Sequence, residues 1–179
     1  LRLDGYLNLD LVNNFNYGEQ INLTYKSNGD NQQALDLNTS LPYLCKSPIS
    51  ISAGLNIFRQ DSTFSNTAQF LETSLNITAN TSISTSLKLE QSTTPQNQTD
   101  NTAEAYKKQI YSATFNYSKT KNSTLKNQPT FLRFTAGSGF RKTETQKTTN
   151  QFIANLNAAY TFDISQKHSF YIKSETALL

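Results

Sequence analysis

Hydrophobic and polar residues alternate along most of this chain. In residues 1–12, leucine occupies positions 1, 3, 7, 9 and 11, and mostly polar residues stand between them. Successive side chains of a β-strand point to opposite faces, so a period of two predicts a strand with one apolar face. Residues 1–12 are therefore expected to form a strand that is apolar on one side and polar on the other.

The same alternation recurs nine times further along the chain. Its apolar positions fall within residues 21–25, 35–43, 49–57, 71–77, 83–89, 111–117, 132–136, 152–162 and 170–178. Turn-forming residues separate successive runs, and no segment carries a comparable stripe at the helical period. No window approaches the roughly 18 consecutive apolar residues of a membrane helix. The pattern predicts an all-β fold, an antiparallel meander of about ten strands.

The polar positions of several strands carry charged residues. Buried unpaired charges are costly, so this face of the sheet must contact water. A soluble β-sandwich also has one wet face, which means that alternation alone does not separate a sandwich from a membrane barrel. If the sheet belongs to a barrel, the candidate lumen-facing residues are Arg2, Asp4, Asp10, Arg133, Lys173 and Glu175.

Strand length and aromatic residues favour the membrane barrel. Runs of ten to fourteen residues match the about 9 to 11 residues that a tilted strand needs to cross a bilayer. Aromatic residues near the expected strand ends resemble an interfacial girdle, although ordinary strand propensity also explains them. They are Tyr17, Tyr25, Tyr43, Phe58, Tyr106, Phe140 and Phe162.

The connections predict a topology. Short turns at Asn13, Leu44, Ala79 and Ile164 are expected on the periplasmic side, and longer loops near Asn28, Asp61, Pro95 and Lys147 on the cell exterior. Residues 91–106 have no alternating apolar face and contain a proline and two acidic residues. This segment is expected to be a mobile exterior loop outside the barrel wall.

Composition and motifs give no sign of catalysis. The 179 residues carry a net charge of +3 without a dense basic run, so nucleic acid is not an expected partner. Cys45 is the single cysteine and has no partner for a disulfide or a zinc site. His168 and Asp163 flank a turn without a nucleophile elbow, and Gly137-Ser138-Gly139 lacks the third glycine of a dinucleotide site. The glycines predict a bulge or a close strand approach, and no enzyme activity, cofactor or metal is expected.

Residues 12–44 contain a recognisable series of short motifs. Asn13, Asn14 and Phe15 are followed by Gly18-Glu19 and, after two strands, by Pro42-Tyr43. This stretch resembles the start of the barrel in the bacterial surface antigen superfamily, the BamA- and TamA-like outer-membrane assembly and translocation proteins. Residues 47–64 are similar to flavobacterial-type members, and residues 151–179 resemble the strand pair before the family's large inward-folded loop.

The resemblance implies a Gram-negative outer-membrane protein that inserts or translocates β-rich polypeptides. Its partners would be outer-membrane lipid, other outer-membrane or periplasmic proteins and unfolded β-barrel clients. The ten strands would correspond to the second through the eleventh of about sixteen. The first strand, the Arg-Gly-Phe loop and the C-terminal strands of such a barrel are not in residues 1–179. A passive porin-like channel and a surface adhesin-like β-protein remain as alternatives.

Overall fold

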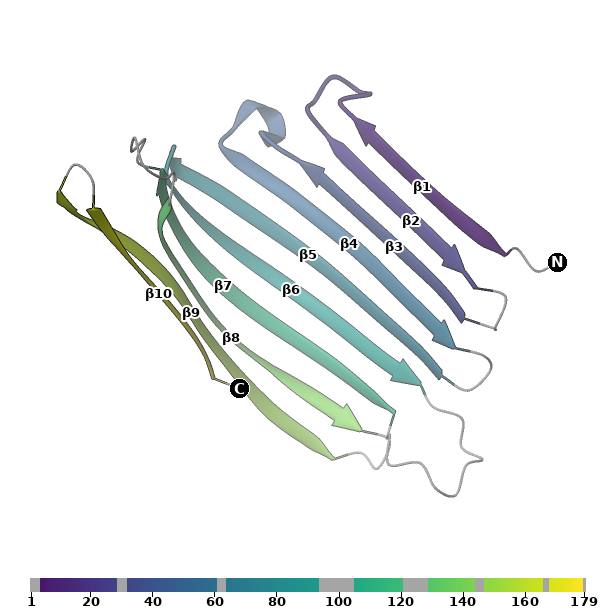
Figure 1. Ribbon diagram of the computed structural model, residues 1–179. Helices are drawn as coiled ribbons and strands as arrows, with labels where there is room; N and C mark the ends of the chain where they lie inside the picture. The colour runs from purple at the N-terminus through teal and green to yellow at the C-terminus, as the bar shows by residue number, and fades with distance from the viewer. Residues whose placement is uncertain are drawn as a thin grey trace.

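The chain folds into one antiparallel sheet of ten strands, each paired with the next in sequence (Figure 1). The computed structural model describes residues 4–28, 32–60, 64–93, 105–120, 129–143, 147–165 and 168–178. The strands are β1 (Gly5–Val12), β2 (Gln20–Ser27), β3 (Gln32–Leu41), β4 (Ile49–Gln60), β5 (Phe64–Thr78), β6 (Thr81–Thr93), β7 (Tyr106–Thr120), β8 (Pro129–Thr143), β9 (Thr148–Ser165) and β10 (His168–Leu178). The prediction of an all-β meander of about ten strands is confirmed.

Two strands extend into the segment that was expected to be a loop. β6 continues to Thr93 and β7 begins at Tyr106, so residues 91–93 and 106 belong to the sheet. Gln91 lies opposite Lys107, and Ser92 lies opposite Tyr106. The prediction for 91–106 was wrong at these ends because backbone pairing continues after the apolar alternation stops. Residues 94–104 lie outside the described residues.

The strand register places all the apolar stripes on one face. Directly opposed residues of an antiparallel pair lie on the same face of the sheet. Leu9, Leu23, Leu37 and Leu55 form one continuous row across β1 to β4. A second row on the same face, which passes through Leu75 in β5 and Ile83 in β6, holds Phe115, Phe134 and Leu156 in β7, β8 and β9. The ten alternating segments therefore combine into one apolar face and one polar face.

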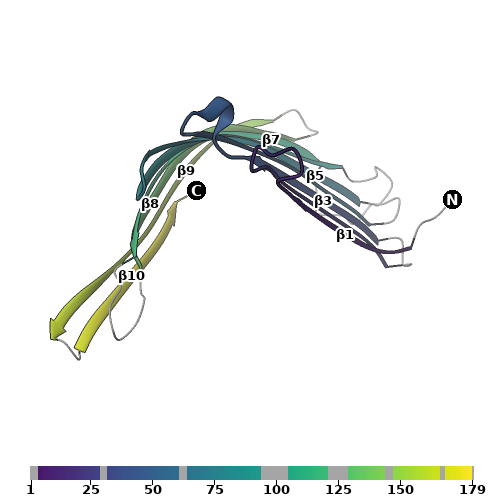
Figure 2. The same ribbon diagram turned by 90° about the horizontal axis from the view of Figure 1, so that it is seen from above.

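The sheet is strongly curved, as the view from above shows (Figure 2). Side chains crowd together on a concave face and spread apart on a convex one. On the polar face, Ser84 and Ala159 are each only 4% exposed, whereas Leu71 and Tyr111 on the apolar face are 50% and 53% exposed. The polar face is therefore concave and the apolar face is convex.

The described sheet has no second layer and hence no conventional core. No described large side chain is fully buried, and 26 large hydrophobic residues are exposed. The accessible surface is 13019 Å², whereas a folded soluble monomer of 20.1 kDa exposes about 8,700 Å². The convex apolar face needs a non-aqueous environment or another layer to cover it.

Two glycines allow β7 and β8 to approach closely on the concave side. A Cβ atom added to Gly139 would collide with the backbone carbonyl oxygen of Gln109, and one added to Gly137 would lie 2.7 Å from that of Tyr111. The register between β7 and β8 is continuous here, without a bulge. Of the two expectations for this Gly-Ser-Gly segment, the close strand approach is confirmed.

Successive connections alternate between the two ends of the sheet. One end, here called the turn end, carries the connections 13–19, 42–48, 79–80, 121–128 and 166–167, and the other, the loop end, carries 28–31, 61–63, 94–105 and 144–147. The predicted grouping of the connections is confirmed. The predicted difference in length is wrong, because 13–19 and 42–48 are longer than 28–31 and 61–63. The longest connection, 94–105, is at the loop end.

Candidate functional site

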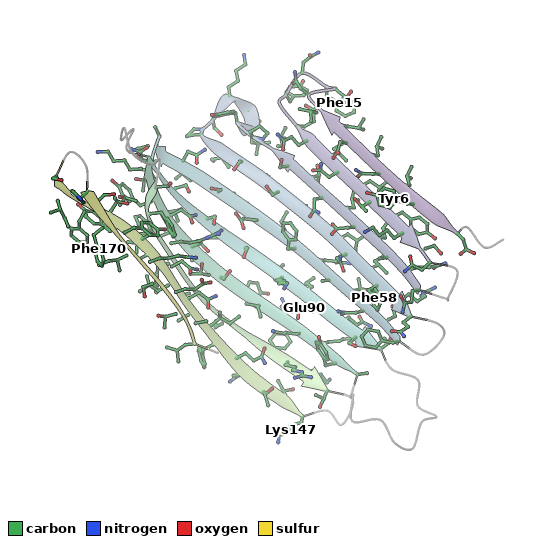
Figure 3. The ribbon with its side chains drawn as sticks, in the orientation of Figure 1. Tyr6, Phe15, Phe58, Glu90, Lys147 and Phe170 are labelled. Carbon is green, nitrogen blue, oxygen red and sulfur yellow. The ribbon has the colours of Figure 1, made fainter. Side chains whose placement is uncertain are left out.

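Charged residues lie on the concave face, among them Glu90 on β6 (Figure 3). Strand register places on this face Asp10, Lys26, Asp36, Glu72, Lys88, Glu90, Lys108, Arg133, Arg141, Lys173 and Glu175. Small polar residues fill much of the space between them; for example, Ser86 and Ser112 form a hydroxyl–hydroxyl hydrogen bond of 2.7 Å. The concave face is thus a hydrophilic wall.

Four of the six predicted lumen-facing residues share this face, but they do not form a cluster. Asp10 accepts a hydrogen bond from Asn22 on β2, and Arg133 on β8 lies opposite Asn116 and Asn157. On β10, Lys173 pairs with Glu175 at 3.6 Å. Asp4 precedes β1 and accepts a hydrogen bond of 2.9 Å from Ser27, and Arg2 lies outside the described residues.

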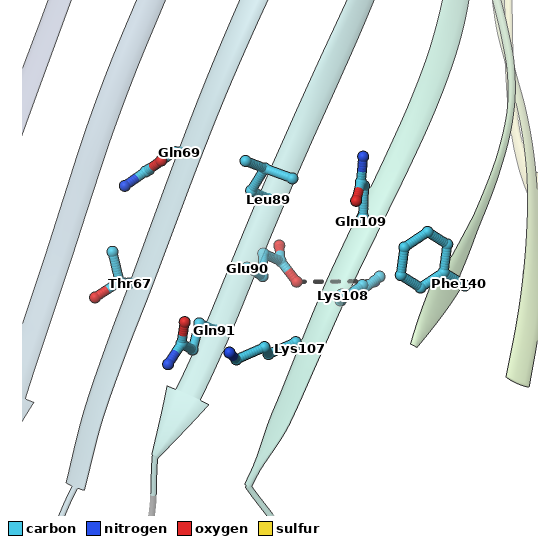
Figure 4. Close-up of a pocket in the computed structure, with 9 residues that line it drawn as sticks. All are labelled: Thr67, Gln69, Leu89, Glu90, Gln91, Lys107, Lys108, Gln109 and Phe140. Carbon is cyan, nitrogen blue, oxygen red and sulfur yellow. Dashed lines mark ion pairs between the residues drawn. The ribbon is translucent and has the colours of Figure 1, made fainter. Parts of the chain in front are cut away.

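The densest charged cluster on the concave face spans β6 to β8 and was not predicted. The Glu90 carboxylate lies 2.6 Å from Lys88 Nζ. It also lies 3.8 Å from Lys108 Nζ, and Figure 4 shows this second pair. Arg141 lies opposite Lys108 and stacks its guanidinium 4.3 Å from the Tyr106 ring centroid. Alternation places each residue on this face, but only the register between strands brings them together.

The convex face has a different charge pattern. In the described strands it carries no Asp or Glu, and its Lys and Arg residues are four: Arg59, Lys107, Lys119 and Lys142. Each of the four is the second residue from an end of its strand. The middle of the convex face is therefore free of charge from β1 to β10. Long basic side chains at the margins of an apolar band can extend their charged groups to water.

The apolar band crosses the sheet diagonally. In β2 the band is centred on Leu23, and the row of directly paired residues that starts at Leu23 reaches Asn150 in β9. In β9 the band covers residues 152–162 and is centred seven residues beyond Asn150. β9 is seven strands away from β2, so the centre of the band shifts by one residue along the strand for each strand crossed. With the usual spacings of a sheet, this shift corresponds to strands inclined by about 35° to the normal of a flat apolar layer. Transmembrane barrels tilt their strands by about 35–45°.

Glu19 holds the turn between β1 and β2. Its carboxylate accepts backbone N–H bonds from Phe15 at 2.5 Å and Tyr17 at 3.1 Å, and the Asn13 side chain accepts one from Gly18. The bond from the Phe15 amide, with smaller contributions from other backbone amides, lowers the pKa of Glu19 below its ordinary value. The charged carboxylate is thus the form that stabilises this turn, which contains the Gly18-Glu19 motif of the resemblance.

The described residues contain no arrangement typical of a catalytic or metal centre. No group of three or more His, Cys, Asp or Glu side chains could hold a metal ion among them. His168 Nδ1 lies 3.0 Å from Ser165 Oγ across the β9–β10 turn, and Cys45 is exposed in the short 3-10 helix η1 (Leu44–Lys46).

No helix in the described part of the chain is long and apolar enough to cross a membrane. Comparisons with protein-family models, with curated proteins and with solved structures found no match to this chain.

Proposed function

We propose that this chain forms part of the wall of a transmembrane β-barrel in a bacterial outer membrane. Its convex face would contact lipid and its concave face would line a water-filled lumen. The proposal depends mainly on one observation: the convex face is apolar and free of charge between the strand ends, while the charged residues of the strand interiors lie on the concave face. Transmembrane barrels have this outward apolar band and polar interior.

A soluble fold predicts the opposite arrangement. A sandwich packs the apolar face of each sheet against a second sheet, and a small soluble barrel fills its interior with apolar side chains. Here the face that curvature encloses is the polar one. The diagonal course of the apolar band adds independent support, because it matches the inclination of strands in a membrane barrel.

The open edges support membership in a larger barrel. Among the described residues, β1 pairs only with β2 and β10 only with β9. Unpaired strand edges are not tolerated in hydrocarbon, because no water is present to hydrogen-bond their backbone groups. Further strands would have to close the sheet, and about sixteen in total is the number that the sequence resemblance implies.

Within this class, we propose a function in the insertion or translocation of β-rich polypeptides. Its support is the resemblance carried by residues 12–44, with Gly18-Glu19 in a turn and Pro42-Tyr43 just after β3. A passive porin-like channel is the second candidate, and the charged concave face favours it, since such a wall can select solutes.

The full-length protein in lipid vesicles distinguishes these functions. We expect heat-modifiable migration on gels and faster insertion of an unfolded β-barrel client into the vesicles. A large, stable, ion-selective conductance without any effect on the client would replace the assembly function with the porin-like one. A protein that is soluble without detergent and does not shift on heating would refute the membrane barrel and leave the adhesin-like alternative.

A further inference from the structure

Three basic residues mark the loop end of the convex face, and they are named here the basic belt: Arg59 on β4, Lys107 on β7 and Lys142 on β8. Lys107 and Lys142 are directly opposed in the register. Like charges in this position destabilise a sheet unless an anion lies near them. No carboxylate of the described strands shares their face, so the belt is open to an anion from outside the sheet.

Two hollows adjoin the belt at the same level. One has a volume of about 300 Å³ and is lined on the convex side by Thr67, Gln69, Gln91, Lys107 and Gln109 together with the apolar Leu89 and Phe140; Glu90 and Lys108 of the concave face also border it (Figure 4). The other, about 330 Å³, also includes Lys107 and adds Lys142 and Thr143. Lys107 borders both hollows. Three glutamine amides thus stand near Lys107, and that of Gln109 also donates a hydrogen bond to the Tyr111 hydroxyl.

We propose that this surface binds the phosphorylated headgroup of an outer-leaflet glycolipid. The lysines would bind the phosphate, and the glutamine amides and Thr67 would hydrogen-bond the sugar hydroxyls. The inference rests on the proposed membrane barrel, since penultimate strand positions then lie at the depth of the lipid headgroups. The loop end, which carries the longest connection (94–105), is taken here as the outward-facing end of the barrel.

The turn end lacks a comparable surface. In the described strands, Lys119 is the one Lys or Arg residue on its convex margin. Aromatic residues line this margin, with Phe162 opposite Phe170 and Tyr160 opposite Ile172. Aromatic rings suit the interface of an ordinary phospholipid leaflet, whereas clustered lysines suit a leaflet rich in phosphate. The difference between the two ends favours the glycolipid leaflet at the loop end.

The test uses the full-length protein in detergent, titrated with bisphosphorylated lipid A and followed by native mass spectrometry. The K107Q/K142Q variant should bind the lipid about thirtyfold more weakly, which corresponds to about 1 kcal/mol for each lysine. Wild-type protein should lose affinity similarly for dephosphorylated lipid A. The control variant K88Q/K173Q removes two charges from the concave face and should bind like the wild type.

Unchanged lipid A binding by K107Q/K142Q would overturn the proposal. The proposal would also be overturned if K107Q/K142Q lost binding only to phosphatidylglycerol vesicles, because that result would assign the basic belt to a phospholipid. A third result would also overturn the proposal: millimolar inorganic phosphate competes for the site, and the protein binds phosphorylated and dephosphorylated lipid A with equal affinity. That result would show a site for free phosphate. Heat-modifiable migration of the same preparations separates failure of this inference from failure of the proposed function. If the barrels show heat-modifiable migration but no selective lipid binding, only this inference is refuted. If the wild type shows no heat-modifiable migration, the proposed function is refuted.

Discussion

Replacing Leu71 with arginine is expected to destabilise the membrane-embedded protein by about 2–4 kcal/mol. Leu71 is near the middle of β5 on the convex face, between Ala53 and Leu87 on the neighbouring strands. An arginine there would place a charge in the centre of the apolar band, far from the strand ends where Arg59 and Lys107 lie. Unfolding in urea, followed by the heat-modifiable gel shift of the full-length protein in lipid vesicles, measures the change.

The matched control is Glu72→Arg on the concave face of the same strand. Glu72 lies between Ser52 and Ser86, so an arginine there has polar neighbours. We expect its effect on the free energy of unfolding to stay within about 0.5 kcal/mol, as for surface substitutions away from special features. Leu71 is 50% exposed, so a water-facing sheet would tolerate both substitutions equally. Equal tolerance is the result that contradicts a lipid-facing convex surface.

Replacing Gly139 with alanine is expected to lower the free energy of unfolding by about 1–3 kcal/mol, the usual cost of overpacking. The added Cβ would meet the Gln109 carbonyl oxygen and the Cα of Ile110. Both atoms belong to the β7 backbone, so rotation of a side chain cannot relieve the collision and the two strands must separate. Chemical denaturation of the full-length protein in detergent measures the loss.

Ser138→Ala is the control for this substitution. Ser138 is adjacent to Gly139 in β8 but points to the convex face, opposite Tyr111 and Phe152. It should leave stability within about 0.5 kcal/mol of the wild type. If Gly139→Ala were as mild as Ser138→Ala, the close approach of β7 and β8 on the concave side would not hold.

The strands could be predicted from the sequence because the alternation is regular within each of the ten runs and stops in the connections between them. A period of two depends on the pleat of each strand alone and needs no knowledge of its neighbours. The ends of the strands were harder to predict. Gln91, Ser92 and Thr93 have the composition of a loop and yet belong to β6, which pairs with β5 and β7. Polar ends of this kind cannot be separated from loops without the pairing partner.

The candidate site could be predicted only in part, for a similar reason. Asp10, Arg133, Lys173 and Glu175 fall on the polar face by alternation alone. The cluster around Glu90 depends on register, because Lys108 meets Glu90 only when β6 and β7 are aligned. Alternation also says nothing about curvature, so the sequence left open whether the polar face is concave. Backbone contacts between strands, such as those that Gly139 permits between β7 and β8, are likewise not specified by alternation.

Spin-label accessibility along β5 distinguishes a lipid-facing convex surface from a water-facing one. Labels are placed one at a time at residues 71–75 of the full-length protein in lipid vesicles, with Cys45 replaced by serine because it is exposed. We expect labels at Leu71, Thr73 and Leu75 to respond to oxygen dissolved in the bilayer, and those at Glu72 and Ser74 to respond to a water-soluble nickel reagent. Access of the nickel reagent to all five positions, or the reversed alternation, would contradict a lipid-facing convex surface and a water-filled concave one.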